Sequence, residues 1–369
     1  MHITHMPPTK AIPVTEPFLP PFKDYVRRLQ GIWERKLLTN DGPLVQELEQ
    51  KLQTHHGLGR MARCLANGAL GLQIAFKALG VAGEVITSPF SYVATASCPL
   101  WEGCRLVFAD IEPDSLTLDP QAIEAAITPR TEAIVAPHVF GNPCDVEAIA
   151  AIAAKRGLAV IYDAAHAFGV NFKGRSILEW GDVSMVSLHA TKLFHSVEGG
   201  FVVAQTPEVD AKLEWMRRFG HNGPGDFHGV GINAKMSEFH AAMGLCVFDH
   251  LDTILSLRRS RSEDYDVGLA GCPGLADGIA WRTGASRNYA YYSVLFESER
   301  MLLRAVDRLH RASVFPRRYF HPSLDTVASL GSWGDCPVSQ DVSSRVLCLP
   351  LSTSMDEDDV ARVCELIRG

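Results

Sequence analysis

Short apolar runs, many of them β-branched, recur between residues 60 and 205 and alternate with segments in which apolar residues have helical spacing. The helical spacing is clear at 70–79 and 146–154. Continuous apolar strands that alternate with helices are typical of a mostly parallel sheet covered by helices on both faces. The pattern therefore predicts an α/β fold with a ligand crevice at the carboxyl ends of the strands, which are expected at 84–87, 105–108, 133–136, 158–162, 183–186 and 201–204.

The pattern changes after residue 205. A helical stretch at 209–219 leads to a glycine-rich loop, after which one long helix is expected to begin at Ser237 and to end in a basic segment at 258–261. The rest of the chain predicts a smaller α+β unit, with a strand near 290–296 and helices near 301–312 and 355–367. We therefore expect three tightly packed parts, namely an N-terminal arm at 1–40, a large domain at 41–250 and a small C-terminal domain at 251–369.

The composition narrows the classes of partner. The 369 residues are 47% hydrophobic and 21% charged, as in ordinary soluble globular proteins, and suffice for one large domain and a smaller one. A net charge of −7 argues against nucleic acid or an anionic membrane as the main partner. Neither a signal peptide nor a membrane span is expected, because no apolar stretch approaches about 20 residues.

The nine cysteines are scattered, and none forms a C-x-x-C pair. The sequence therefore signals neither a zinc site nor a redox motif, and we expect no metal. Most of these cysteines lie in apolar surroundings, where reduced, buried thiols are expected. A reducing cytoplasm is the compartment that fits best.

Two candidate catalytic residues follow predicted strands. Asp163 ends the run at 158–162, and a carboxylate at the tip of a buried strand is unfavourable unless a cation meets it. Taken alone, an aspartate that caps the next helix is the more common interpretation. Lys192 lies 29 residues further on, after the next strand and shortly before the double glycine 199–200. A lone loop lysine is usually solvated, but this segment is apolar enough to lie inside.

Together these residues match the needs of pyridoxal phosphate (PLP). Its aldehyde forms a Schiff base with a lysine amine, for which Lys192 is the candidate. Its pyridine nitrogen must stay protonated for the ring to act as an electron sink, and Asp163 is the candidate carboxylate. An opposite charge at about 4 Å in an effective dielectric near 20 is worth roughly 4 kcal/mol, or about three pKa units.

The phosphate and the ring of this cofactor need partners as well. Segment 67–69 opens the predicted helix at 70–79, where free backbone amides bind anions, and Ser187 offers a hydroxyl. Tyr92 follows the strand at 84–87 and is a candidate to stack on the ring. Taken alone, a plain helix cap explains residues 67–68 better, and most aromatic residues in the position of Tyr92 belong to the core.

At these residues the sequence resembles the DegT/DnrJ sugar aminotransferases, a family of fold type I PLP enzymes. The resemblance runs from about Thr39 to the C-terminus. It is carried by many motifs in chain order, including Asn67-Gly-Ala69, Ser88-Pro-Phe-Ser-Tyr-Val-Ala-Thr95, Pro137-His-Val-Phe-Gly141, Asp163-Ala-Ala-His-Ala167, Ser187-Leu-His-Ala-Thr-Lys192, Gly231-Ile-Asn-Ala-Lys-Met236 and Leu349-Pro-Leu351. The fold that it implies is the fold type I aminotransferase fold, with the large domain binding PLP.

The resemblance assigns roles around the cofactor ring. It implies that Lys192 forms the Schiff base and that Asp163 binds the pyridine nitrogen. His166 stands where the family usually has glutamine, which contacts the phenolic oxygen of the ring, and histidine can donate the same hydrogen bond. Tyr92 would stack on the ring where phenylalanine is common.

The resemblance also implies a phosphate site and a second subunit. Gly68 and Ala69 match the phosphate-binding turn, and Ser187 would contact the same phosphate. The family typically has threonine where Ala69 stands, so one hydroxyl contact is absent. Asn233 and Lys235 match a loop that enters the neighbouring subunit's site, which implies a homodimer, although a plain turn before a helix also explains Asn233.

The reaction implied is transfer of an amino group from L-glutamate to the keto carbon of a nucleotide-linked sugar. The preferred substrate is dTDP-4-keto-6-deoxy-D-glucose, giving dTDP-4-amino-4,6-dideoxy-D-glucose, because His166 and the segment 317–320 look most like that subgroup. Arg318 and Tyr319, with Lys192, are expected to bind the substrate. A solvated surface explains segment 317–320 equally well.

Three alternatives stay open. One is an aminotransferase for a 3-keto sugar. Another is a PLP-dependent sugar dehydratase, but relatives of that kind replace the lysine with histidine, whereas Lys192 is retained here. The last is a non-catalytic regulator, against which the intact set of Asp163, Ser187 and Lys192 argues.

Overall fold

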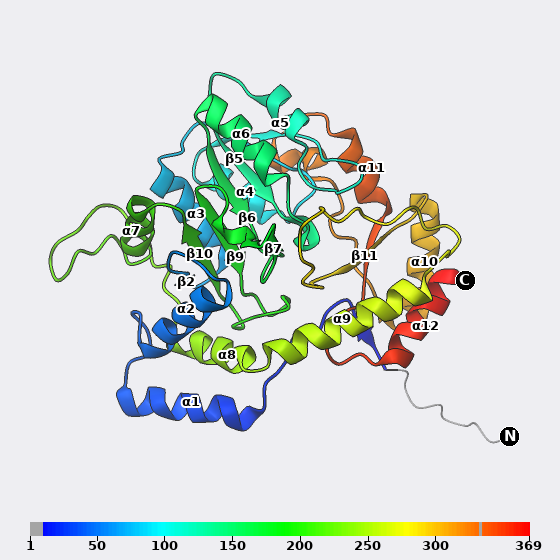
Figure 1. Ribbon diagram of the computed structural model, residues 1–369, viewed down its shortest axis with the longest axis horizontal. Coiled ribbons are helices and arrows are strands. Elements are labelled where there is room, and N and C mark those ends of the chain that lie inside the picture. Colours follow the sequence, from blue (N-terminus) through cyan, green and yellow to red (C-terminus); the bar gives the residue numbers. More distant parts are fainter. Residues whose placement is uncertain (1–9, 332–333) are drawn as a thin grey trace.

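A computed structural model describes residues 10–331 and 334–369 (Figure 1). Its centre is a seven-stranded sheet of order β2-β10-β9-β6-β5-β3-β4. The strands β4, β3, β5, β6 and β9 run parallel, and β10 is antiparallel to both of its neighbours. Their bounds are β2 (Arg63–Leu65), β3 (Glu84–Thr87), β4 (Arg105–Phe108), β5 (Thr131–Pro137), β6 (Ala159–Asp163), β9 (Val183–Ser187) and β10 (Gly200–Ala204).

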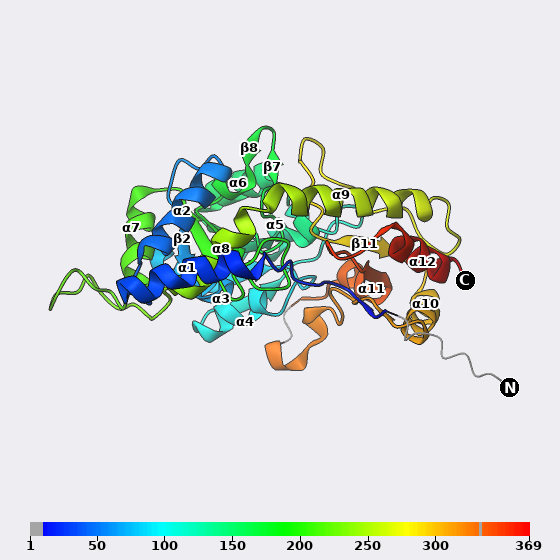
Figure 2. The ribbon, with the colours of Figure 1, turned by 90° about the horizontal axis from the view of Figure 1, so that it is seen from below.

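Helices cover both faces of this sheet, as Figure 2 shows for α6 on one side and α3 and α4 on the other. The inner strands are largely buried on both faces, in keeping with their continuous apolar sequences, whereas Arg105 at the start of the edge strand β4 is exposed. The predicted fold class is therefore confirmed. One face is covered by α3 (Gly68–Leu79), α4 (Ala94–Trp101) and α7 (Pro207–Met216), and the other by α2 (Pro43–His55), α5 (Pro120–Ala126), α6 (Val146–Arg156) and α8 (Glu238–Phe248).

The single long helix predicted from Ser237 is wrong in two respects. The chain leaves helical geometry at His250 (φ −115°, ψ 9°), so α8 is followed by a separate helix, α9 (Leu251–Gly268). This second helix continues past the basic segment, and Figure 2 shows it running on towards α12. Arg258 of the basic segment lies within α9 and its side chain is buried. Its guanidinium donates to the backbone oxygens of residues 289, 290 and 351 at 2.6–3.0 Å, which compensates for the burial of its charge.

The C-terminal part has its own core beside the large sheet (Figure 1). A strand pair, β11 (Tyr292–Leu295) and β13 (Val346–Leu349), runs antiparallel and is packed by α10 (Glu299–Arg311), α11 (Pro337–Arg345) and α12 (Glu357–Arg368). The N-terminal β1 (Ile12–Pro13) pairs in parallel with β12 (Val314–Phe315), and α1 (Phe22–Arg35) packs on α8. The arm thus contacts both parts, and the division at residues 40 and 250 stays a prediction.

Two further expectations bear on the chain as a whole. All nine cysteines are unpaired and buried, as predicted for reduced thiols. Across residues 10–331 and 334–369, none of the helices is both long enough and apolar enough to cross a membrane.

Parallel neighbours in the sheet bring the candidate residues to one edge. Asp163 is the last residue of β6 and Ser187 the last of β9, and these two strands are paired in parallel. The amino end of α3 and the end of β5 lie at the same edge. The predicted crevice at the carboxyl ends of the strands is therefore present.

Candidate active site

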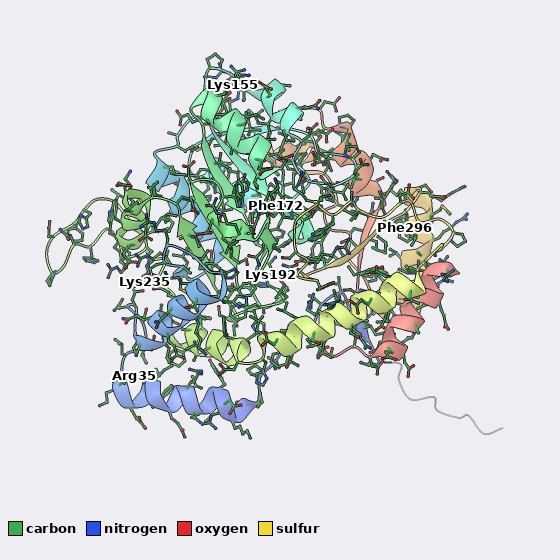
Figure 3. All side chains as sticks on the ribbon, in the orientation of Figure 1. Arg35, Lys155, Phe172, Lys192, Lys235 and Phe296 are labelled. Atoms are coloured by element: carbon green, nitrogen blue, oxygen red, sulfur yellow. The ribbon has the colours of Figure 1, made fainter. Side chains whose placement is uncertain are left out.

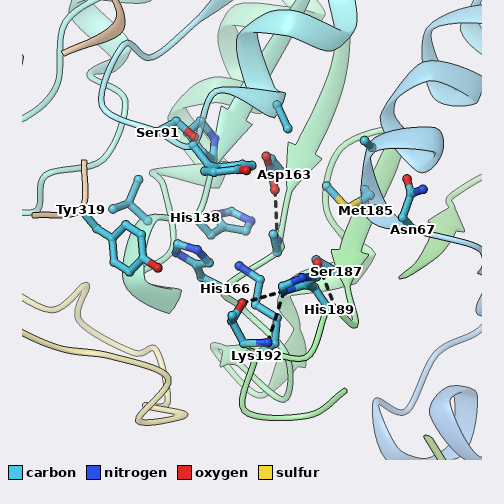
Figure 4. A pocket seen from close by; sticks show the side chains of 18 of the residues that line it. Asn67, Ser91, His138, Asp163, His166, Met185, Ser187, His189, Lys192 and Tyr319 are labelled. Carbon is cyan, nitrogen blue, oxygen red and sulfur yellow. Dashed lines mark hydrogen bonds between the residues drawn. The ribbon is translucent and has the colours of Figure 1, made fainter. Parts of the chain in front are cut away.

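A cavity of about 500 Å³ lies at this edge of the sheet (Figure 4). The large domain lines it with the ends of β5, β6 and β9 and with the start of α3. The C-terminal part closes it with Tyr291, Arg317, Tyr319 and Phe320. Figure 4 shows Lys192 between His166 and His189, with Asp163 above them in the view. The site is thus built between the two parts of the chain.

Asp163 is a buried carboxylate held by neutral donors. Thr95 Oγ1 donates to its Oδ2 at 2.7 Å, and the amide of Ala165 donates to its Oδ1 at 3.1 Å. Ser91 Oγ lies 2.8 Å from Thr95 Oγ1 and is the donor of that pair, because the proton of Thr95 is already committed. Burial raises the pKa of Asp163, while these hydrogen bonds and the charge of Lys192 oppose the rise. Asp163 makes no ion pair within the described residues, so its charge is available to a bound cation.

Lys192 presents its amine to the cavity from the loop after β9. Its backbone amide donates to the oxygen of His189 at 2.9 Å, and the loop is closed by the amide of Ala190, which donates to the oxygen of Val197 at 2.7 Å. The amine Nζ lies 3.4 Å from the phenolic oxygen of Tyr291. Burial lowers the pKa of Lys192, and the charge of Asp163 opposes this. A larger fraction of this amine is therefore neutral and nucleophilic than for an ordinary lysine.

His166 is fixed in one tautomer. The amide of Phe140 donates to its Nδ1 at 3.2 Å, so the neutral ring carries its proton on Nε2. Burial, with a smaller contribution from the charge of Lys192, holds the pKa of His166 well below its usual 6.5. The ring lies between Tyr291, at 4.4 Å between centroids, and Phe320, at 5.7 Å. His166 is therefore a neutral hydrogen-bond donor at neutral pH.

The amino end of α3 forms a cradle for an anion. Asn67 caps the helix, with its Oδ1 accepting from the amide of Leu70 at 2.9 Å, which leaves the first helical amides free. A Cβ on Gly68 would lie 2.7 Å from Met185 Sδ, and a Cβ on Gly200 would lie 2.7 Å from the amide nitrogen of Gly68. Glycine at both positions thus lets the helix end approach β9 and β10, next to the hydroxyl of Ser187.

The profile of the DegT/DnrJ/EryC1/StrS aminotransferase family matches residues 23–368. The chain belongs to this family. It is 40% identical over 364 residues to the dTDP-4-amino-4,6-dideoxy-D-glucose transaminase of Shigella dysenteriae, covering 97% of this chain and 99% of the relative. A transaminase of the same name from Escherichia coli is 36% identical over 368 residues, covering 98% and 99%.

Among solved structures, that of DesI in the presence of its TDP-sugar product superposes with a TM-score of 0.91 at 34% identity, covering 97% of this chain and 92% of that one. These likenesses confirm the predicted enzyme class, a sugar aminotransferase.

Most of the predicted cofactor residues of this aminotransferase line one cavity. The set comprises Gly68, Ala69, Tyr92, Asp163, His166, Ser187 and Lys192. Tyr92 lines the cavity and is 59% exposed. Of the predicted substrate residues, Tyr319 lines the cavity with Lys192.

Other predicted residues of the aminotransferase lie elsewhere. Arg318 does not line the cavity: its guanidinium donates to Glu299 Oε1 at 2.8 Å and to the oxygen of Ser344 at 2.9 Å. Asn233 and Lys235 bind each other, with Lys235 Nζ 2.6 Å from the Asn233 side-chain oxygen, and do not line the cavity. Figure 3 shows Lys235 well away from Lys192. Their expected role in a neighbouring subunit stays a prediction.

Sequence reasoning missed several residues of this site. Tyr291 and Arg317 line the cavity from elements distant in sequence from Lys192, and the buried Thr95 acts on the site through its hydrogen bond to Asp163. Thr95 and Arg317 lie inside segments already noted, so the motif at 88–95 was the available signal for Thr95. Nothing in the sequence around Tyr291 indicates that it lies beside the lysine.

Proposed function

We propose that this aminotransferase holds PLP on Lys192 and transfers an amino group from L-glutamate to a nucleotide-linked 4-keto-6-deoxy sugar. The sugar we propose is dTDP-4-keto-6-deoxy-D-glucose, which would give dTDP-4-amino-4,6-dideoxy-D-glucose. The observation that carries the proposal is one cavity lined by both the carboxylate of Asp163 and the amine of Lys192. The names of the relatives from Shigella dysenteriae and Escherichia coli support the choice of sugar.

The residues present fit PLP. The buried carboxylate of Asp163, which has no ion-pair partner among the described residues, suits a protonated pyridine nitrogen. The free amides at Gly68 and Ala69, with the hydroxyl of Ser187, suit a phosphate. The amine of Lys192 would hold the aldehyde carbon. When bound, PLP supplies an aldehyde that links to amines and a ring that stabilises a carbanion.

Each residue then has a defined task. The anionic Asp163 keeps the pyridine nitrogen protonated, because an opposite charge close by favours the protonated form. The neutral amine of Lys192, once free, takes the proton from the α carbon of the amino donor and returns one to the new amine-bearing carbon. His166 would donate from Nε2 to the phenolic oxygen of the bound ring, and Tyr92 would cover the face of that ring. Tyr319 contributes to the substrate side of the cavity.

The proposal includes a cytoplasmic homodimer with shared active sites. Support comes from the loop between α7 and α8, which extends from the body of the molecule in Figure 1. This loop exposes apolar side chains, with Phe227 58% and Val230 90% exposed. Such side chains are expected to be covered by another surface. Asn233 and Lys235, at the end of this loop, would reach the neighbouring subunit's cavity.

The test of the function is a substrate panel. The purified protein would be incubated with PLP, L-glutamate and a set of 3-keto and 4-keto nucleotide sugars, and the products identified by NMR. We expect amination at C4 of dTDP-4-keto-6-deoxy-D-glucose, absent from Lys192→Ala. Reaction with small keto acids or aldehydes but with none of the sugars would contradict the proposed substrate.

A further inference from the structure

Arg317 is a cation of the cavity that is not neutralised by the protein. Of the described residues that line the cavity, Lys192 and Arg317 alone are lysine or arginine. The guanidinium of Arg317 makes no ion pair and no side-chain hydrogen bond within residues 10–331 and 334–369. Its neighbour Arg318, in contrast, is held by Glu299 and Ser344. Two adjacent arginines therefore differ in role, and only Arg317 is free to bind a ligand.

The backbone fixes the position of Arg317 beside β13. Its amide donates to the oxygen of Cys348 at 3.0 Å, and the amide of Cys348 donates to the oxygen of Arg317 at 2.8 Å. The guanidinium carbon lies 5.3 Å from the centroid of the Tyr319 ring. Tyr319 packs edge-to-face on Tyr291 at 5.8 Å, and Tyr291 contacts the amine of Lys192. Arg317 thus stands on the cavity wall, separated from the reactive amine by aromatic rings.

The two substrates of the proposed function both carry an anionic group remote from the carbon that exchanges the amine. In L-glutamate, the side-chain carboxylate carbon lies about 4 Å from the α carbon, since carbon–carbon bonds are about 1.5 Å long. In a 4-keto hexose, C1 lies across the ring from C4 and carries the diphosphate. Each substrate therefore places an anion at a similar distance from the carbon that exchanges the amine. Lys192 and the α3 amides are engaged by the cofactor, which leaves Arg317 for this anion.

We propose that Arg317 binds the anionic group of the substrate that is remote from the reacting carbon. The group is the side-chain carboxylate of the amino donor, the diphosphate of the sugar nucleotide, or each in turn. The assignment rests on the proposed function for the identity of the substrates. Arginine suits both anions, because its planar guanidinium forms two parallel hydrogen bonds with a carboxylate or a phosphate.

Equilibrium binding tests the diphosphate. The dissociation constant of thymidine diphosphate would be measured by calorimetry on the PLP-loaded wild-type protein and on Arg317→Gln, Arg317→Lys and Arg318→Gln. We expect about tenfold or greater weakening in Arg317→Gln, as for loss of a charged hydrogen bond, with partial recovery in Arg317→Lys. Arg318→Gln should bind within about twofold of wild type. An unchanged thermal unfolding midpoint in Arg317→Gln excludes a folding defect as the cause.

Half-reactions test the carboxylate. The absorbance change of the PLP-loaded protein would be measured as a function of the concentration of L-glutamate and of L-alanine, which lacks the side-chain carboxylate. If Arg317 binds this carboxylate, Arg317→Gln should raise the half-saturating concentration of glutamate about tenfold or more. The half-saturating concentration of alanine should stay within about twofold of wild type. A loss confined to thymidine diphosphate assigns Arg317 to the sugar nucleotide, and a loss confined to glutamate assigns it to the donor.

The failure of this inference differs from failure of the proposed function. Two results for Arg317→Gln would overturn the proposed role of Arg317 while amino transfer persists. One is an equal loss of apparent affinity for glutamate and alanine with unchanged binding of thymidine diphosphate. The other is no loss of affinity for any of the three ligands. If wild type binds thymidine diphosphate through Arg317 but neither amino acid changes the cofactor absorbance, the aminotransferase function fails and the anion site stands.

Discussion

The amine of Lys192 lies 3.4 Å from the phenolic oxygen of Tyr291, whose ring centroid lies 4.4 Å from that of His166. One tyrosine of the C-terminal part thus contacts both the lysine and the histidine that the large domain supplies. Arg258 fixes the backbone next to this tyrosine by donating to the oxygen of Ala290 at 2.6 Å. The orientation of the lysine therefore depends on how the two parts are packed.

We expect Tyr291→Phe to slow amino transfer by about tenfold or less, because it removes one hydrogen-bond partner of Lys192 and keeps the ring. Steady-state kcat would measure the change. Tyr292→Phe is the matched control, since the hydroxyl of Tyr292 binds Asp266 at 2.9 Å, away from the cavity. Equal rates in Tyr291→Phe and wild type would show that the contact with Lys192 has no role in turnover.

Thr95→Val should weaken PLP binding. Valine keeps the shape but removes the donor that lies 2.7 Å from Asp163 Oδ2, so the pKa of Asp163 rises and its hold on a cationic ring weakens. A hydrogen bond to a charged group is worth roughly 1.5–3 kcal/mol, so the dissociation constant should rise about tenfold or more in an absorbance titration. Thr87→Val is the control, because Thr87 is as buried but donates to the oxygen of Val135. Identical affinities in the two variants would refute the prediction.

The pKa of Lys192 in the PLP-free protein should lie below the usual 10.5, because burial disfavours its charged form. It can be measured by NMR titration after reductive methylation with labelled formaldehyde. Asp163→Asn should lower the pKa further, since the carboxylate favours the protonated amine. A pKa at or above 10.5, or an upward shift in Asp163→Asn, would contradict the electrostatics proposed for the site.

His56 should make the protein less stable in acid. Burial, with His55 beside it, lowers the pKa of His56 from 6.5 to about 3. Between these values the unfolded chain binds a proton that the folded protein excludes, so stability falls as the pH drops below 6.5 and levels off near 3. For His56→Phe we expect the loss of unfolding free energy between pH 7 and 5 to be smaller by about 2 kcal/mol. Urea titrations at both pH values would measure it, and an equal pH dependence in the two proteins would disprove it.

The central strands could be predicted because they are buried on both faces and are continuous apolar runs. The strand expected at 158–162 is observed at Ala159–Asp163, for example. The short β2 was missed, since its three residues give no periodic signal and its partner β10 is far along the chain. The break between α8 and α9 was missed as well, because helical spacing persists across His250.

The site could be predicted where its chemistry follows strand ends or a cap, as at Asp163 and Lys192. The site could not be predicted where tertiary packing decides which side chains reach the cavity. Adjacent residues of an extended segment point in different directions, and the sequence does not say whether Arg317 or Arg318 reaches the cavity. Tyr291 meets Lys192 across 99 residues of chain, and neither residue's surroundings in sequence indicate this contact.

Borohydride trapping tests the central claim most directly. The purified protein would be loaded with PLP, reduced with sodium borohydride, digested and mapped by mass spectrometry, with Lys192→Ala treated in parallel. We predict a phosphopyridoxyl group on Lys192 in the wild-type protein and none on the corresponding peptide of the variant. Reduction that leaves Lys192 unmodified, or that modifies only other lysines such as Lys235, would contradict the assignment of Lys192 as the cofactor lysine.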